Sequence, residues 1–180
     1  MPVYIAMLRG INVSGQKLIK MEGLRASLGS LNFGDVQTYI QSGNIVFKAA
    51  KAAPADLGKR IARQILDDFG FEVPVLVRTA QELGGVLKAN PLLKRPGIDE
   101  AKLHVTFLSA AVPGQAEAVL KTLAGKSELF AVGGWEIYLY CPDGYGITKL
   151  SNSAIEKRLS GRATTRNWKT VNVLNAMAAS

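Results

Sequence analysis

The sequence predicts an α+β fold built from two ferredoxin-like (α/β plait) subdomains, the second one modified at its C-terminus. Two observations predict it. Residues 1–78 read as strand, helix, strand, strand, helix, strand, and residues 79–180 partly repeat this order. The predicted domains are therefore a βαββαβ subdomain over 1–78 and a second plait-like subdomain with a C-terminal helix over 79–180.

In the first half, residues 3–8 form a nearly continuous apolar run that is typical of a covered strand. Residues 9–20 are rich in Gly, Asn and Ser and predict a loop. Apolar residues spaced by three and four predict helices over 21–31 and 57–69, the second ending at Gly70. The β-rich stretches 36–40 and 45–47 flank 41–44 and predict a hairpin, and 71–77 predicts the closing strand.

In the second half, helices are predicted over 80–88, 115–124 and 154–159, with a break at Asn90-Pro91. Residues 103–107 alternate as a strand, and 129–132 with 135–141 form a hairpin across Gly133-Gly134, which is a two-residue turn signal. Where the first half has its last strand, this half has the polar run RATTRN, which we interpret as replacing that strand. A helical pattern then follows at Trp168, Val171, Leu174 and Met177.

Composition excludes several classes of protein. The chain has 180 residues with 48% hydrophobic and 20% charged content, which is typical of a globular protein. A single cysteine, Cys141, cannot form an internal disulfide, and no apolar run is long enough to span a bilayer. The first residues show no basic leader, so we expect a cytoplasmic protein. With one histidine, one cysteine and scattered acids, no metal site and no cofactor are predicted; a thiolate pair of Cys141 and His104 would require the fold to join them.

Charge is the one compositional feature that points to a partner. Twenty-two Lys and Arg against fourteen Asp and Glu give a net charge of +8, which favours encounters with phosphate-bearing ligands. The excess is greatest after residue 147, where the sequence has six cations and a single acid, Glu156. The alternative is a basic protein whose charge serves only to keep it in solution. The six cations are Lys149, Lys157, Arg158, Arg162, Arg166 and Lys169.

The loop over 9–20 is the first candidate site. A loop between a strand and a helix can present backbone N–H groups to an anion, with Arg9, Asn12, Lys17 and Lys20 nearby. It is not a P-loop, because Gly15 is followed by Gln-Lys-Leu and no hydroxyl could hold magnesium. A structural turn that happens to be basic is the alternative.

Two further polar segments are candidates. Gln41, Ser42 and Asn44 at the first hairpin offer donors and acceptors, although simple closure of the hairpin explains them equally and no nucleophile elbow is present. Around 162–168, Asn167 or Thr165 could cap the last helix while Arg162 and Arg166 converge on an anion. Core packing is the alternative for Trp168, and a salt bridge for Arg166.

Several blocks of the chain resemble a bacterial family known as domain of unknown function 1697. They include Met7–Val13 with Gly15, Thr38–Phe47, Asn90-Pro91, His104–Leu108, Thr148–Leu150 and Ala163–Trp168, and the resemblance covers essentially the whole chain. It implies a cytoplasmic protein of two plait-like subdomains and no established activity. The chain departs from the family's pattern at Ser14, where a second glycine is expected.

The leading hypothesis is a module that binds phosphate-rich ligands, either single-stranded nucleic acid or a nucleotide, through basic loops and an open sheet face. A rival is an enzyme acting on a small anionic or phosphorylated metabolite in a cleft between the subdomains, with Arg9, Lys149 and Arg166 holding the anion. A third possibility is a non-catalytic homodimer with paired sheets. The sequence nominates no catalytic residue.

Overall fold

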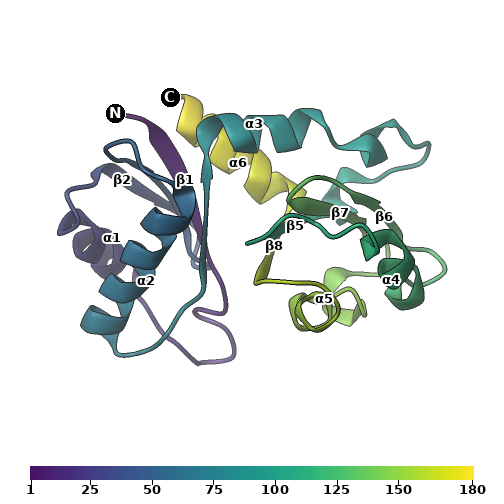
Figure 1. Cartoon of the computed structure of the whole chain (residues 1–180), viewed down its shortest axis with the longest axis horizontal. Coiled ribbons are helices and arrows are strands. Elements are labelled where there is room, and N and C mark those ends of the chain that lie inside the picture. The colour runs from purple at the N-terminus through teal and green to yellow at the C-terminus, as the bar shows by residue number, and fades with distance from the viewer. The chain divides into compact units, whose positions relative to one another are not determined.

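The computed structural model describes all residues 1–180 and contains eight strands and six α-helices (Figure 1). The residues form two compact units. Unit 1 comprises Met1–Gly84 together with Leu174–Ser180, and unit 2 comprises Gly85–Val173. The predicted α+β class is confirmed. The sequence placed one boundary at residues 78 and 79; in the structure the division lies at 84, and the last seven residues belong with the first unit.

Unit 1 is a four-stranded antiparallel sheet with two helices. The strands β1 (Val3–Leu8), β2 (Gly34–Tyr39), β3 (Asn44–Lys48) and β4 (Val75–Thr79) lie in the order β2-β3-β1-β4. Helix α1 (Met21–Gly29) connects β1 to β2, and α2 (Pro54–Phe69) connects β3 to β4. Each connection therefore leads to a strand that is not the sheet neighbour of the one before it.

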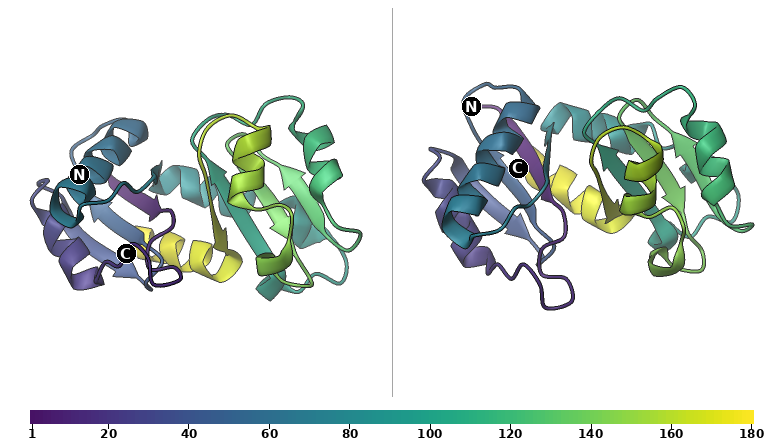
Figure 2. Two further views of the ribbon diagram at one scale, coloured as in Figure 1. Left: turned by 90° about the horizontal axis from the view of Figure 1, so that it is seen from below. Right: turned by 60° about the horizontal axis from the view of Figure 1, so that its bottom comes forward.

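The sequence of α2 explains its length and its packing. Pro54 occupies the first turn, where a missing N–H costs nothing, and Gly70 ends the helix at a φ of 82° with its N–H donating to the carbonyl of Leu66. A stripe at Leu57, Ile61 and Ile65 is completely buried against the sheet. The helices α1 and α2 lie on one face of the unit 1 sheet (Figure 2), and this stripe is part of the core between them and the sheet.

Unit 2 repeats this topology. Its strands β5 (Leu103–Leu108), β6 (Leu129–Val132), β7 (Glu136–Tyr140) and β8 (Ala163–Asn167) lie in the order β6-β7-β5-β8. Helix α4 (Ala116–Leu123) connects β5 to β6, and α5 (Asn152–Arg158) connects β7 to β8. Both helices contribute to a core with the inward residues of β5, β7 and β8.

The two units correspond residue by residue at their last strand. In unit 1, Ile5 of β1 pairs with Arg78 of β4; in unit 2, Val105 of β5 pairs with Arg166 of β8. Each last strand leads directly into a helix, α3 (Ala80–Lys88) or α6 (Trp168–Ala179). Arg78 and Arg166 thus hold equivalent positions, and both are buried, with exposed fractions of 7% and 8%.

Three sequence predictions need correction. The polar run over 162–167 does not replace a strand, because 163–167 is β8 and pairs with β5; its two threonines suit an extended backbone, and only alternate positions face the core. The closing strand of unit 1 is shifted to Val75–Thr79. The tip of the second hairpin is shifted by one residue to Gly134-Trp135, since Val132 pairs with Ile137 and the Gly133 N–H donates to the carbonyl of Glu136 at 2.8 Å.

Neither sheet has an open face for bases. In unit 1 the side opposite α1 and α2 carries Ile5 and Met7, both fully buried, and in unit 2 the corresponding side carries Val105 and Phe107, also fully buried. The expectation that a sheet face could receive nucleobases is therefore wrong. No helix is long and apolar enough to cross a membrane.

Candidate functional site

Two of the segments singled out in the sequence meet at one end of the unit 1 sheet. The loop 9–20 and the hairpin turn 40–43, here called the loop cluster, are connected by hydrogen bonds from Asn12 and from Leu8, the last residue of β1. Leu8 N–H donates to the carbonyl of Gly43 at 2.8 Å, and Asn12 Nδ2 donates to the carbonyl of Gln41 at 2.7 Å. The Arg9 N–H donates to Pro74 at 3.0 Å, so the chain entering β4 contacts the same region.

Asn12 fixes the conformation of this cluster. Its Oδ1 accepts from the Ile19 N–H at 2.8 Å, while its Nδ2 donates to the carbonyls of Ile19 and Gln41. One side chain therefore closes the loop on itself and attaches it to the hairpin. All of its strong hydrogen-bonding groups are used within the protein, which makes Asn12 a structural residue of the site.

The backbone of the loop cluster is unusually rich in left-handed residues. Seven of the chain's thirteen positive-φ residues lie in it. Ser14 and Gly15, at 53° and 72°, form the two-residue turn between Val13 and Gln16, which pair as a bridge. Ile40 has a φ of 51°, an outlier for a β-branched residue, and yet half of its side chain is exposed. The other left-handed residues are Gly10, Asn12, Lys17 and Gly43.

The surface of the loop cluster combines cations with aliphatic side chains. Lys17 donates through Nζ to the carbonyl of Glu72 at 2.7 Å and Lys20 is exposed, whereas Arg9 is only half-exposed. Val13, Leu18 and Ile40 are exposed by 57%, 66% and 50%. Acids are present too, at Glu22 and Glu72, so the positive charge here is modest.

The hairpin residues close the turn. Asn44 is completely buried, and its Nδ2 donates to the Tyr39 carbonyl at 3.0 Å and to Ser42 Oγ at 2.8 Å. The backbone carbonyl of Gln41 accepts the hydrogen bond from Asn12, and the Gln41 side chain is exposed. Simple closure of the hairpin accounts for the positions of Asn44 and Ser42.

In unit 2 three exposed cations lie close together in sequence around the C-terminal end of α5. Lys157 and Arg158 lie in its last turn and Arg162 follows just before β8; we call these three the basic corner. All three are exposed, and none is in an ion pair. The acid of this segment, Glu156, accepts from the Ala163 N–H at 2.9 Å. Lys149, before α5, is exposed as well.

Arg166 and Asn167 have different surroundings from Arg162. Arg166 is 8% exposed and donates through Nη1 to Thr164 Oγ1 at 2.8 Å and to the Thr165 carbonyl at 3.0 Å. Burial lowers its pKa to about 10, so it stays cationic at neutral pH. Asn167 caps α6, because its Oδ1 accepts from the Thr170 N–H at 2.8 Å. Trp168 is buried, as expected for a core residue.

Sequence reasoning missed a polar cluster on the helix-covered face of the unit 2 sheet. It consists of His104, Thr106, Tyr145, Asn152 and Thr165, and we call it the histidine cluster. Thr165 Oγ1 donates to Asn152 Oδ1 at 2.7 Å. Since a hydroxyl has one proton, the 2.7 Å contact between Thr106 and Thr165 must have Thr106 as its donor. A directed chain of hydrogen bonds thus holds the Asn152 amide in place.

His104 is the unusual member of this cluster. Its ring stacks on Tyr145 with centroids 4.9 Å apart, and its Nδ1 is buried without a hydrogen-bond partner. A buried polar atom of this kind costs about 1–3 kcal/mol, which a core residue would normally avoid. Burial lowers the pKa of His104, and the nearby Lys102 carbonyl opposes this in part. In the sequence, only the pairing of β5 with the Thr-rich β8 could have indicated the polar surroundings of His104, and the sequence did not predict β8.

Cys141 is not a partner for His104 in thiolate chemistry. Its side chain is completely buried, and burial together with the nearby Glu128 raises its pKa to about 11. The thiol therefore stays protonated at neutral pH, and a thiolate nucleophile is not available at this position.

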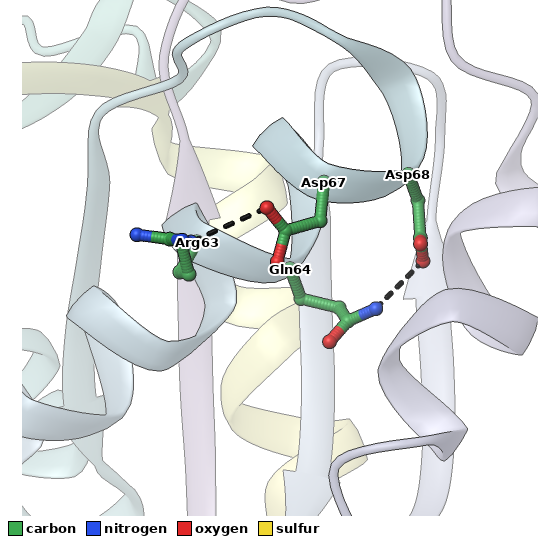
Figure 3. A network of polar contacts seen from close by, with 4 residues as sticks. All are labelled: Arg63, Gln64, Asp67 and Asp68. Atoms are coloured by element: carbon green, nitrogen blue, oxygen red, sulfur yellow. Dashed lines mark hydrogen bonds and ion pairs between the residues drawn. The ribbon is translucent and has the colours of Figure 1, made fainter.

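The acids of α2 serve the structure of unit 1. Figure 3 shows Arg63 reaching Asp67 one turn away, with Nε and Oδ1 3.2 Å apart, and Gln64 donating to Asp68 at 2.8 Å. Ser27 of α1 also donates to Asp68, which ties the two helices together and lowers the pKa of that carboxyl. No group of three His, Cys, Asp or Glu residues lies together as metal ligands would.

Comparisons with known proteins identify the family. No curated protein matches the sequence. A similar solved structure is described as that of the conserved bacterial protein SP0830 from Streptococcus pneumoniae, with a TM-score of 0.77, 24% sequence identity and 98% of each chain covered; this likeness shows the fold alone. The family described as "Protein of unknown function (DUF1697)" matches residues 1–138. With well over half of its residues matched, the chain belongs to the DUF1697 family.

Proposed function

We propose that the protein binds phosphate-rich polymers, most simply single-stranded nucleic acid, through the basic corner of unit 2. The observation that carries the proposal is that Lys157, Arg158 and Arg162 are exposed within six residues and have no ion-pair partner. Cations that no acid neutralises are free to release counterions from a phosphate backbone. The net charge of +8 supports the same partner.

The proposal relies on loops and helix ends rather than on a sheet face. The central strands of both sheets are buried on both faces, and no RNP-type aromatic platform is available on them. The loop cluster, with Lys17, Lys20 and its exposed aliphatic side chains, is a second surface for the same polymer. We further propose that each unit is a ferredoxin-like plait, since both have the βαββαβ order with sheet order 2-3-1-4, and that the protein works in the cytoplasm.

The test is fluorescence anisotropy of labelled single-stranded RNA and DNA of increasing length across a salt series. The variant K157Q/R158Q/R162Q lowers the formal charge from +8 to +5. If the basic corner contacts phosphates, this variant should reduce the slope of log affinity against log salt by about 2, at roughly 0.7 for each lost contact on a single strand.

A matched control removes the same charge elsewhere in unit 2. Lys94, Arg95 and Lys126 are also exposed and outside any ion pair. K94Q/R95Q/K126Q should retain the wild-type salt slope. Equal slopes for the two triple variants would mean that net charge alone attracts the strand, and absence of binding at low salt would overturn the proposal.

The second candidate function is an enzyme that acts on a small anionic metabolite, and the histidine cluster is the observation that favours it. It supplies the titratable side chain that the sequence did not nominate. A homodimer with paired sheets is less favoured at β2, because the register slips between Gly34 and Gln37 and Asp35 is left-handed. Such a bulge twists an edge strand away from intermolecular pairing.

A further inference from the structure

We propose that the histidine cluster of unit 2 is a binding site for a small oxyanion, that is, the phosphate or carboxylate group of a small molecule. The proposal does not rest on the nucleic-acid function, because the cluster and the basic corner share no residue. Three segments form the site: β5, β8 and residues 145–152. Their hydrogen-bonding directions, their exposure and their charge all favour an anion.

The hydrogen bonds of the cluster run in one direction. Thr106 donates to Thr165, and Thr165 donates to Asn152 Oδ1, so the chain ends with the acceptor of Asn152 occupied. The Nδ2 group of Asn152 then has two N–H donors and no acceptor in the protein. Thr106 is fully buried and Asn152 is half-exposed, so the chain runs outward and presents these donors at the surface.

His104 adds a ring nitrogen to the same face of the sheet, two positions before Thr106 on β5. Strand pairing places His104 opposite Asn167 and Thr106 opposite Thr165, so these four residues occupy neighbouring positions across β5 and β8. Nδ1 of His104 is shut away from solvent without a partner, while the residue as a whole is half-exposed. Of the two ring nitrogens, Nε2 is therefore the one that remains for a ligand. A ligand that accepts from Nε2 and from Asn152 Nδ2 would use the donors that the protein leaves open.

The charge of the three segments is positive. They contain Lys149, Arg166 and His104 and not one aspartate or glutamate. Lys149 is exposed between Tyr145 and Asn152 and supplies this charge, whereas Arg166 alternates with Thr165 along β8 and lies on the opposite face of the sheet. Donors without acids, next to fixed positive charge, select an acceptor-rich anion over a cation or a neutral amine.

The test exploits the fact that His104 is the only histidine. Its imidazole proton signals in NMR spectra are followed during titration with inorganic phosphate, and separately with succinate, against sodium chloride at matched ionic strength. We expect a saturable shift with one of the two oxyanions and none with chloride. A response to phosphate alone or to succinate alone identifies the ligand's group, and the absence of a saturable shift with either overturns the proposal.

Asn152→Asp is the decisive variant. Aspartate keeps an oxygen acceptor for Thr165 and therefore preserves the buried chain, but it removes both N–H donors and adds a negative charge. Binding should weaken about tenfold or more. Gln115→Glu makes the same change of charge at an exposed position before α4 and should leave binding unchanged.

Two further results distinguish binding at the histidine cluster from binding at the basic corner and from a loss of folding. K157Q/R158Q/R162Q should keep the His104 response, even if it loses nucleic-acid binding, because the basic corner lies beyond the opposite end of β8. An unchanged affinity in N152D, with thermal stability equal to that of the wild type, would overturn the site.

Discussion

Asn12 is the residue on which the conformation of the loop cluster depends most. Replacing it by alanine removes three hydrogen bonds and leaves the Ile19 and Gln41 backbone groups without a partner. Asn12→Ala should lower the free energy of unfolding by about 1–3 kcal/mol beyond any backbone penalty. Urea unfolding measures the loss.

Asn32 provides the control for that backbone penalty. It is also left-handed, with a φ of 61° against 54° for Asn12, but it is exposed and its side chain makes no hydrogen bond. Asn32→Ala therefore reports the strain of alanine at a positive φ alone, about 1 kcal/mol. Equal losses in the two variants would show that the Asn12 side chain does not fix the loop.

His104 should make stability depend on pH in a defined direction. Burial lowers its pKa below the ordinary value of 6.5, so the unfolded chain takes up a proton at a higher pH than the folded one. Well above pH 6.5 His104 is neutral in both states, and its protonation does not change the free energy of unfolding. That free energy falls as the pH drops through 6.5 towards the folded pKa. NMR titration of the only histidine gives that pKa directly.

His104→Phe should remove this pH-dependent component. Phenylalanine keeps an aromatic ring against Tyr145, has no titratable nitrogen and leaves no buried polar atom unpaired. The difference in unfolding free energy between variant and wild type should therefore grow as the pH falls below 6.5. A folded-state pKa at or above 6.5 would contradict the prediction.

At the scale of elements, the hairpin of β2 and β3 depends on Gly43. A Cβ at this position would lie 2.6 Å from Cβ of Leu8, and the φ of 84° already disfavours any side chain. Gly10 has a similar φ of 76°, but a Cβ there meets nothing. Gly43→Ala should destabilise by about 2–4 kcal/mol and Gly10→Ala by about 1 kcal/mol, measured by thermal or urea unfolding.

The two variants share the backbone penalty, so their difference isolates the fit of the hairpin against β1. A difference near zero would mean that the turn moves away from Leu8 at little cost, and that the hydrogen bond between Leu8 and Gly43 is not a fixed part of the loop cluster.

How well an element was predicted depends on how much of its pattern comes from burial. α2 was found because Leu57, Ile61 and Ile65 repeat at helical spacing and Gly70 ends the pattern. β8 was missed because its inward positions include Thr165, whose hydroxyl is satisfied by Thr106 and Asn152, residues distant in sequence. No local pattern reports a polar core position that depends on such partners.

The same reason limited the candidate site. Lys149 and Arg162 could be named from charge alone, and Asn167 from its place before a helix. Asn152 and His104 look unremarkable in sequence, because Asn152 matters through a hydrogen-bond chain between β5, β8 and α5, and His104 through its buried, unpaired Nδ1. The capping and turn-closing roles of Asn167 and Asn44 follow from local chemistry, and these were among the alternatives that the sequence offered.

At the scale of the whole molecule, the last helix is divided between the units. Trp168–Val173 belongs to unit 2, whereas Leu174–Ser180 belongs to unit 1, where Met177 and Ser180 line a hollow with Val3 and Val46. Truncating a buried side chain on either side of this division should therefore loosen a different sheet. Leu174 and Val171 are both fully buried and provide the pair to compare.

Leu174→Ala should lower the free energy of unfolding by about 2–5 kcal/mol, with the loss concentrated in unit 1. Native-state hydrogen exchange reads out where protection falls. We expect faster exchange in β1 and β3 for Leu174→Ala, and in β5 and β8 for Val171→Ala. If both variants accelerate exchange equally throughout the two sheets, the chain opens as one cooperative body, and the assignment of the last seven residues to unit 1 has no energetic meaning.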